Sequence, residues 1–241
     1  MFIGHYAVGF ALKRPAPRTS LGLLLASALF LDLIWPIFVL LGWEQVRIDP
    51  GNTPFTPLDF VSYPISHSLL TVVGWALVFG LVYALPTRRW AAAVWLGVGV
   101  VSHWVLDLVS HRPDLPLVPG GSMRVGLGLW NSVPATLIVE AAMFVAGVWI
   151  YQRTTRAVDR TGRLGFWILV ALLAVIYVGN AFGQPPPSVR ALALVALAAW
   201  IFPFWAAWID RHRLFIPERF DRIEGGRLTR RPVAGDDTRA E

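Results

Sequence analysis

The chain has 241 residues, of which 56% are hydrophobic and 15% are charged. Soluble domains carry about 25% charged residues, so this composition excludes an ordinary soluble domain and indicates a polytopic membrane protein. The net charge is +6, but the basic residues do not form a stripe with aromatic residues between them, which argues against nucleic-acid binding. Cysteine is absent, so disulfides and thiolate metal sites are excluded.

The first apolar stretch, residues 2–12, is too short to cross a bilayer, which takes about 20 residues. We expect it to form a half-helix or an interfacial helix. Ala26-Ser27-Ala28 is similar to a signal-peptide cleavage site, but the apolar run continues to Trp43, which favours an uncleaved helix. The longer apolar runs predict an all-α membrane bundle with about six transmembrane helices, at 20–42, 67–85, 90–109, 131–151, 164–183 and 189–209.

Residues 1–209 are therefore predicted to form a single transmembrane domain, and 210–241 a charged tail. Of the 21 basic residues, 17 lie before the first span, in alternate loops after it or in the tail. The positive-inside rule places these segments in the cytoplasm and the loops 44–66 and 110–130 outside. We expect a multi-pass protein of the bacterial inner membrane whose predicted partners are membrane lipids, while protein partners are not predicted.

Three acidic residues, Asp32, Asp107 and Glu140, lie inside the predicted spans. Such groups usually pair, bind an ion or line a wet cavity, because a carboxylate in hydrocarbon costs several kcal/mol. Glu140 can carry protons, support a metal-ligating histidine or, in its protonated form, make a helix–helix hydrogen bond, and the last is favoured. Pro36 follows Asp32 by four residues and cannot donate a hydrogen bond to the Asp32 carbonyl. The freed carbonyl and the Asp32 side chain either bind an ion, or the proline only kinks the helix.

His103, Asp107 and His111 are spaced at i, i+4 and i+8, which puts them in one stripe on a helix. His103 and Asp107 can offer a nitrogen and an oxygen to one ion, as paired ligands do in helical metal sites. A His–Asp pair that only satisfies itself inside the bundle is an equal alternative. His67 is the first residue of the predicted span 67–85 and is either an interfacial polar residue or a ligand. Its neighbour Ser68 can cap that helix.

The depth of these side chains in the membrane follows from the helical rise of 1.5 Å per residue. Counted from Trp90, His103 lies roughly 20 Å and Asp107 roughly 26 Å along the span, in the outer half of a ~30 Å core. Asp32, His67 and Glu140 can line the same cavity, open to the outside. His5 reaches it only if residues 2–12 dip into the membrane.

The ordered set His5-x3-Gly9, Asp32, His67-Ser68 and Ser102-His103-x3-Asp107 resembles the membrane-bound metal-dependent hydrolases, the family that includes the LexA-binding inner-membrane-associated hydrolases. The resemblance covers residues 1 to about 145. It implies an all-helical inner-membrane fold and one divalent metal, zinc, held by His5, Asp32, His67, His103 and Asp107.

Two departures from the family pattern favour one metal over two. The family's Pro-Asp-x-Asp-His is Phe30-Leu31-Asp32-Leu33-Ile34 here, and its His-Arg-Gly-x-Thr-His-Ser is Ser62-Tyr63-Pro64-Ile65-Ser66-His67-Ser68. Each stretch has lost potential ligands. A single metal can have up to five protein ligands here, and fewer ligands would leave a position for water.

The function that these features predict is hydrolysis of an ester or phosphoester in a lipid-like substrate near the outer face. Asp32 is either a ligand or the general base, and Ser68, His111 and Glu140 surround the ligands. A proton-coupled transporter is the alternative, because intramembrane acids and proline-interrupted helices also mark such proteins. A non-catalytic scaffold is the third possibility.

Overall fold

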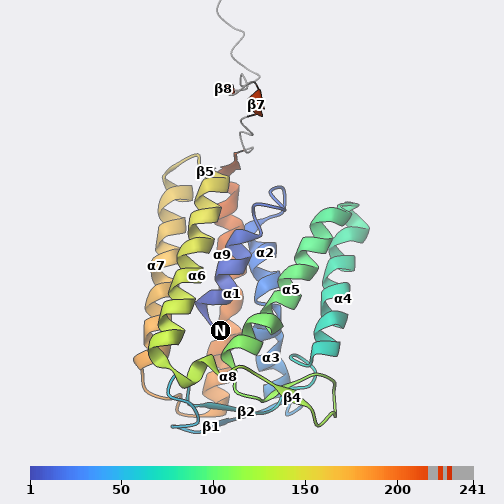
Figure 1. Ribbon diagram of the computed structural model, residues 1–241, viewed down its shortest axis with the longest axis vertical. Helices are drawn as coiled ribbons and strands as arrows, with labels where there is room; N and C mark the ends of the chain where they lie inside the picture. Colours follow the sequence, from blue (N-terminus) through green and yellow to red (C-terminus); the bar gives the residue numbers. More distant parts are fainter. Residues whose placement is uncertain (217–221, 225–226, 230–241) are drawn as a thin grey trace, which may run out of the picture.

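Long apolar helices make up most of the chain, as the composition predicts. The structure is a computed structural model that describes residues 1–216, 222–224 and 227–229. It is an all-α helical bundle (Figure 1). The helices are α1 (Ile3–Ala11), α2 (Leu21–Ala28), α3 (Phe30–Leu40), α4 (Leu69–Thr87), α5 (Trp90–Ser110), α6 (Val133–Thr154), α7 (Arg160–Phe182), α8 (Val189–Leu197) and α9 (Ile201–Arg211).

The predicted spans are confirmed to within a few residues. Helices α4, α5, α6 and α7 are each long and apolar enough to cross a membrane, and so is the continuous helical segment Val189–Arg211. The pair α2 and α3 makes a sixth span if it is counted as one broken helix. Large apolar side chains such as Val82, Val175 and Val195 are exposed on the outer faces, which suits lipid better than water. The helices therefore indicate a multi-pass membrane protein.

The first span is broken at Leu29, where α2 and α3 meet at an angle of 57°. Pro36 lies inside α3, which continues through it, so the sharp bend comes earlier in the chain than the proline suggests. The break matters for the site because α2 ends at Ala28, and the carbonyls of a last helical turn have no partner within their own helix.

Helix α1 is the predicted half-helix, and it lies inside the bundle against α2, α5 and α6, with the N-terminus well within the molecule (Figure 1). Gly147 of α6 allows the closest approach, because a Cβ atom there would overlap the backbone of Ala7. Small residues let membrane helices approach in this way. The residues 2–12 therefore do dip among the spans, as the position of His5 requires.

Short hairpins cover both ends of the bundle. At the end that we call the loop end, β1 (Gln45–Ile48) pairs with β2 (Leu58–Ser62) and β3 (Leu115–Pro116) pairs with β4 (Arg124–Val125), both antiparallel. At the opposite end, which we call the basic end, β5 (Thr155–Ala157) pairs with β6 (Arg213–Phe215). The loops 44–66 and 110–130 thus contain strands that the sequence analysis does not predict.

The predicted tail, 210–241, lies largely outside the described residues. Its first part belongs to the folded bundle, because α9 ends at Arg211 and β6 pairs with β5 directly after it. Farther along, β7 (Arg222–Glu224) pairs with β8 (Arg227–Thr229). The boundary of the transmembrane domain at residue 209 remains a prediction.

Candidate metal centre

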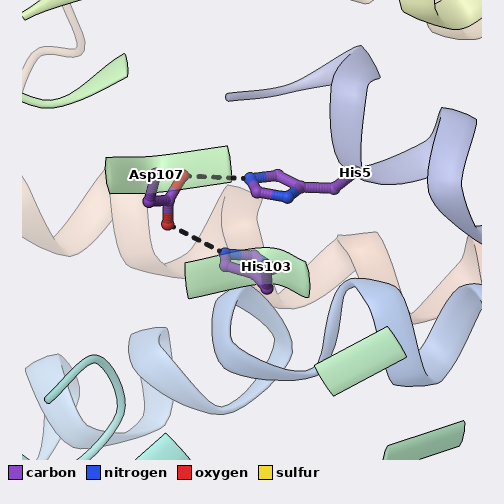
Figure 2. A group of neighbouring side chains, drawn as sticks. All are labelled: His5, His103 and Asp107. Atoms are coloured by element: carbon purple, nitrogen blue, oxygen red, sulfur yellow. Dashed lines mark hydrogen bonds and ion pairs between the residues drawn. The ribbon is translucent and has the colours of Figure 1, made fainter. Parts of the chain in front are cut away.

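The five predicted ligands come from four separate parts of the chain and meet at one place. His5 lies on α1, Asp32 in the first turn of α3, and His103 and Asp107 on α5, while His67 ends the loop before α4. Figure 2 shows His5 and His103 directed at the carboxylate of Asp107. The cluster lies toward the loop end of the bundle, since Asp107 precedes the end of α5 by one turn.

Four of the side chains form a closed ring of ligand atoms. His103 Nε2 lies 3.2 Å from Asp107 Oδ2 and 3.6 Å from Asp32 Oδ1. His67 Nε2 lies 3.7 Å from Asp107 Oδ2 and 3.8 Å from Asp32 Oδ1. Ligands placed tetrahedrally 2.0–2.2 Å from zinc are about 3.3–3.6 Å apart. Four of the six separations among these atoms are therefore close to those that a single tetrahedral ion requires.

The orientation of His103 is fixed by the break in the first span. Its Nδ1 lies 2.8 Å from the carbonyl oxygen of Ala28, and a carbonyl only accepts, so Nδ1 carries the hydrogen. In a neutral ring Nε2 is then a bare acceptor that faces the carboxylates of Asp32 and Asp107. Within the described residues this buried nitrogen has no hydrogen bond of acceptable geometry. Acceptors that face one another in this way are stable only when a cation, either a proton or a metal ion, lies between them.

His67 is oriented by a chain of hydrogen bonds that begins at Glu44. The Ser66 hydroxyl donates to Glu44 Oε2 over 2.6 Å, and Ser66 Oγ lies 2.6 Å from His67 Nδ1. Because the hydroxyl hydrogen is used on Glu44, Ser66 Oγ accepts from His67 Nδ1. This leaves His67 Nε2 without a hydrogen and turned toward Asp32 and Asp107. Metal-ligating histidines are typically held by such a partner on the second ring nitrogen.

Glu44 is itself held firmly in the loop beyond α3. Its Oε1 accepts from the backbone N–H groups of Ile65 and Ser66, each at 2.8 Å, and the residue is 1% exposed. Burial raises the pKa of Glu44, while the hydrogen bonds from Ser66 and Ile65 act in the opposite direction. The loop 44–66, which is predicted to lie outside, thus helps to orient His67 through the buried carboxyl group of Glu44.

His5 contacts the other oxygen of Asp107. Its Nε2 lies 3.1 Å from Asp107 Oδ1, and its ring stacks on that of His103 with centroids 3.6 Å apart. The amino group of Met1 lies 2.7 Å from the same oxygen. The carboxylate of Asp107 therefore presents Oδ2 to the ring of four and Oδ1 to α1. His5 either joins the ligands or fixes the orientation of Asp107.

Asp32 is the member of the cluster that is open to its surroundings. Its side chain is 45% exposed, whereas those of His5, His67, His103 and Asp107 are each 5% exposed or less. Asp32 is therefore the carboxylate of the cluster that molecules outside the bundle can reach. This position suits the predicted alternative role of Asp32 as a general base.

The three residues predicted to surround the ligands differ in what they contact. His111 Nε2 lies 4.0 Å from Asp107 Oδ1, while its Nδ1 lies 2.9 Å from Asp114 Oδ1. Ser68 caps α4 by accepting from Thr71 N–H and makes no described contact with a ligand side chain.

Glu140 acts on the backbone of α1, and none of its hydrogen bonds within the described residues goes to a histidine. Its Oε2 accepts from the N–H groups of Phe2 at 2.8 Å and Gly4 at 3.2 Å, and the residue is fully buried. It thereby satisfies free N–H groups at the start of α1, as an N-terminal cap does. In both of these contacts Glu140, on α6, accepts from the main chain of the segment that carries His5, and the predicted protonation of Glu140 stays a prediction.

Sequence reasoning missed Glu44, Ser66 as a partner of His67, and the carbonyl of Ala28. Glu44 is separated from His67 by 23 positions and is one of several acidic residues in polar loops, so no spacing distinguishes it. A main-chain carbonyl leaves no signal in a sequence. No family model, curated protein or solved structure matches this chain. The structure and the residues themselves therefore carry the functional argument.

Proposed function

We propose that the chain is a membrane-embedded, metal-dependent hydrolase with one divalent cation, zinc, at the His–Asp cluster. The ring formed by Asp32, His67, His103 and Asp107 supports this proposal most strongly, because its nitrogen–oxygen distances of 3.2, 3.6, 3.7 and 3.8 Å are close to those between the ligands of one metal ion. Fixed Nδ1 partners on His67 and His103 add to it, since they leave both Nε2 atoms free to bind a metal. His5 is the fifth candidate ligand.

A divalent cation in this position would supply a Lewis acid that lowers the pKa of water and polarises an ester or phosphoester. The side chains of the chain itself perform the remaining tasks. If Asp32 is not a ligand, His67, His103 and Asp107 would hold the cation and water would take the fourth position. Asp32, as the exposed member, would then accept a proton from that water. Asp107 stays oriented through His5, and Glu140 keeps α1 in place.

The proposed substrate is an ester or phosphoester of a lipid-like molecule. The cluster lies among apolar helices toward the loop end, where a substrate can enter from the bilayer and still place a polar group near water. The distribution of basic residues supports a bacterial inner-membrane protein with its basic end in the cytoplasm and its cluster near the outer face.

Metal content tests the proposal without knowledge of the substrate. Protein purified without a histidine tag is analysed for metals, as wild type and as His103→Ala. We expect about one zinc ion per chain in the wild type and a near-complete loss in the variant, because His103 provides one of the ring atoms. His212→Ala is the matched control, since His212 pairs with Asp159 at the basic end. Equal metal content in wild type and His103→Ala would contradict the proposal.

Hydrolysis is measured on micellar nitrophenyl esters and phosphodiesters after chelation and reloading with zinc. Activity should return with zinc in the wild type. Asp32→Asn should retain folding but lose at least roughly a hundredfold in kcat if Asp32 is the general base. Activity that is indifferent to chelation would contradict a metal-dependent reaction.

A proton-coupled transporter is the second candidate, and the broken span favours it. Transporters often place broken helices at a polar centre, and here α2 and α3 meet at 57° beside Asp32. Proteoliposome uptake that depends on Asp32, in protein that contains no metal, would support transport over hydrolysis.

A further inference from the structure

A separate cavity lies at the basic end of the bundle, away from the His–Asp cluster. It has a volume of about 820 Å³ and lies between α6, α7 and the β5–β6 hairpin. Ligand pockets commonly have volumes of about 300–1,000 Å³. Its wall along the helices is apolar and includes Phe144, Val145, Val148 and Trp167. Val145 and Trp167 are 67% and 49% exposed, so this wall continues into the face that lipid covers.

The other part of the cavity is lined by arginine. Arg156, Arg163 and Arg213 all contribute, and no acidic residue lines it within the part of the chain that the structure describes. Arg156 lies on β5, Arg163 near the start of α7 and Arg213 on β6, so three elements bring positive charge to one place. The cavity is therefore apolar toward the middle of the bundle and cationic toward its end.

Arg213 is the informative member because it is buried, at 7% exposure. Its guanidinium donates to Thr155, Gly162 and Gln152 and lies 5.0 Å and 5.1 Å from the ring centres of Tyr151 and Phe166. Among the described residues no carboxylate lies within 4.0 Å of it. A buried cation that no carboxylate contacts directly favours an anion nearby.

We propose that this cavity binds an anionic phospholipid, with the phosphate between the three arginines and an acyl chain along the apolar wall. Arg156 and Arg163 are exposed and can offer paired N–H donors to the phosphate, while Arg213, whose donors are largely used within the protein, adds a fixed positive charge. Basic pockets between membrane helices on the cytoplasmic side bind anionic headgroups. The charge selects an anionic lipid over a zwitterionic one, and the apolar wall selects a lipid over free phosphate. This inference is independent of the metal centre, which lies toward the other end of the molecule.

Lipid selectivity is the property to measure, with full-length protein reconstituted in phosphatidylcholine bilayers. Spin-labelled phosphatidylglycerol and phosphatidylcholine report how strongly each lipid associates with the protein surface. We expect a preference of roughly fivefold for phosphatidylglycerol in the wild type, since each basic residue near a membrane surface adds affinity for anionic lipid. Addition of millimolar inorganic phosphate should leave this preference in place, and displacement by phosphate alone would overturn the assignment to a lipid.

Arg156→Gln with Arg163→Gln is the informative variant, because both side chains are exposed and their loss does not disturb the core. In this variant the ratio of phosphatidylglycerol to phosphatidylcholine association should fall close to one. Arg88→Gln with Arg89→Gln removes the same charge from the exposed turn between α4 and α5 and should keep most of the preference. If both double variants lose the preference equally, general surface charge explains it and the proposed site is wrong.

Val145→Trp tests the apolar part of the cavity separately. The side chain is 67% exposed, so a larger residue can fill the cavity wall without entering the core. We expect reduced association of phosphatidylglycerol at unchanged charge. Unchanged association in this variant would show that the acyl chain does not lie along the wall and would contradict the proposed mode of binding.

Discussion

At the scale of single residues, the partner of one ring nitrogen decides what the other nitrogen of a histidine can do. Ala28 carbonyl and Ser66 hydroxyl occupy Nδ1 of His103 and His67, and both Nε2 atoms then face Asp32 and Asp107. The metal-binding hypothesis could be formed from the sequence because His103 and Asp107 share a helical stripe. The orientation of the rings could not, because it depends on a main-chain carbonyl and on Glu44, which is far away along the chain.

Ser66→Ala should weaken metal binding without unfolding the protein. The change removes the acceptor from His67 Nδ1 and the donor from Glu44, and loss of such a partner typically lowers metal affinity 10- to 100-fold. Chelator competition measures the affinity, and circular dichroism checks the fold. Ser66→Thr should restore most of the affinity. Ser102→Ala is the control, because Ser102 precedes His103 and, within the described part of the chain, its hydroxyl bonds only the carbonyl of Gly99. Equal losses in the two alanine variants would show that Ser66 has no special role.

At the scale of elements, α1 determines whether His5 belongs to the site. Composition alone predicts that residues 2–12 are too short to span the membrane. It does not predict that α1 packs among the spans, because that depends on Gly147 meeting Ala7 and on Glu140 bonding the first N–H groups of α1. The hairpins β1–β2 and β3–β4 were not predicted either, because strands of two to five residues are too short to show a clear alternation of apolar and polar residues.

Gly147→Ala should separate α1 from α6 and move His5. The added Cβ overlaps the Ala7 backbone, and overpacking of this kind typically costs about 1–3 kcal/mol. We expect a lower melting temperature in detergent together with weaker metal binding. Gly179→Ala on α7 is the matched control, because a Cβ there meets nothing within 4 Å. The packing argument would be wrong if the two variants were equally stable.

The start of α7 predicts a pH dependence at the basic end. Asp159 accepts from Gly162 N–H at 2.8 Å and lies 2.7 Å from His212 Nδ1. The hydrogen bond from Gly162, followed by that from His212, lowers the pKa of Asp159 below its ordinary value. A carboxyl group whose pKa is lower in the folded than in the unfolded protein stabilises the fold above its unfolded pKa, near 3.9. That stabilisation is lost as pH falls through the folded pKa.

Asp159→Asn should therefore be less stable than wild type at pH 7, and the difference should shrink as pH falls below about 4. Asparagine keeps an oxygen for Gly162 N–H, so the comparison isolates the charge. Melting temperatures of the two proteins between pH 7 and pH 3 measure the effect. A difference that stays constant down to pH 3 would show that the ionised carboxylate contributes nothing.

At the scale of the whole molecule, polar chemistry is concentrated at opposite ends of an apolar bundle. The His–Asp cluster lies toward the loop end, and the arginine-lined cavity lies at the basic end. The number of spans follows from the length and apolar character of each run, because the bilayer imposes about 20 residues on every crossing. The meeting of four separate segments at the His–Asp cluster does not follow from any local pattern, since it depends on how the helices pack.

The central claim is that these segments hold one metal ion, and X-ray absorption at the zinc edge tests it most directly. Protein purified without a histidine tag is loaded with one equivalent of zinc and measured as wild type. We predict nitrogen and oxygen ligands at about 2.0–2.2 Å, with the outer-shell scattering of two or three imidazole rings. A spectrum without imidazole scattering, or one that His103→Ala leaves unchanged, would contradict this account.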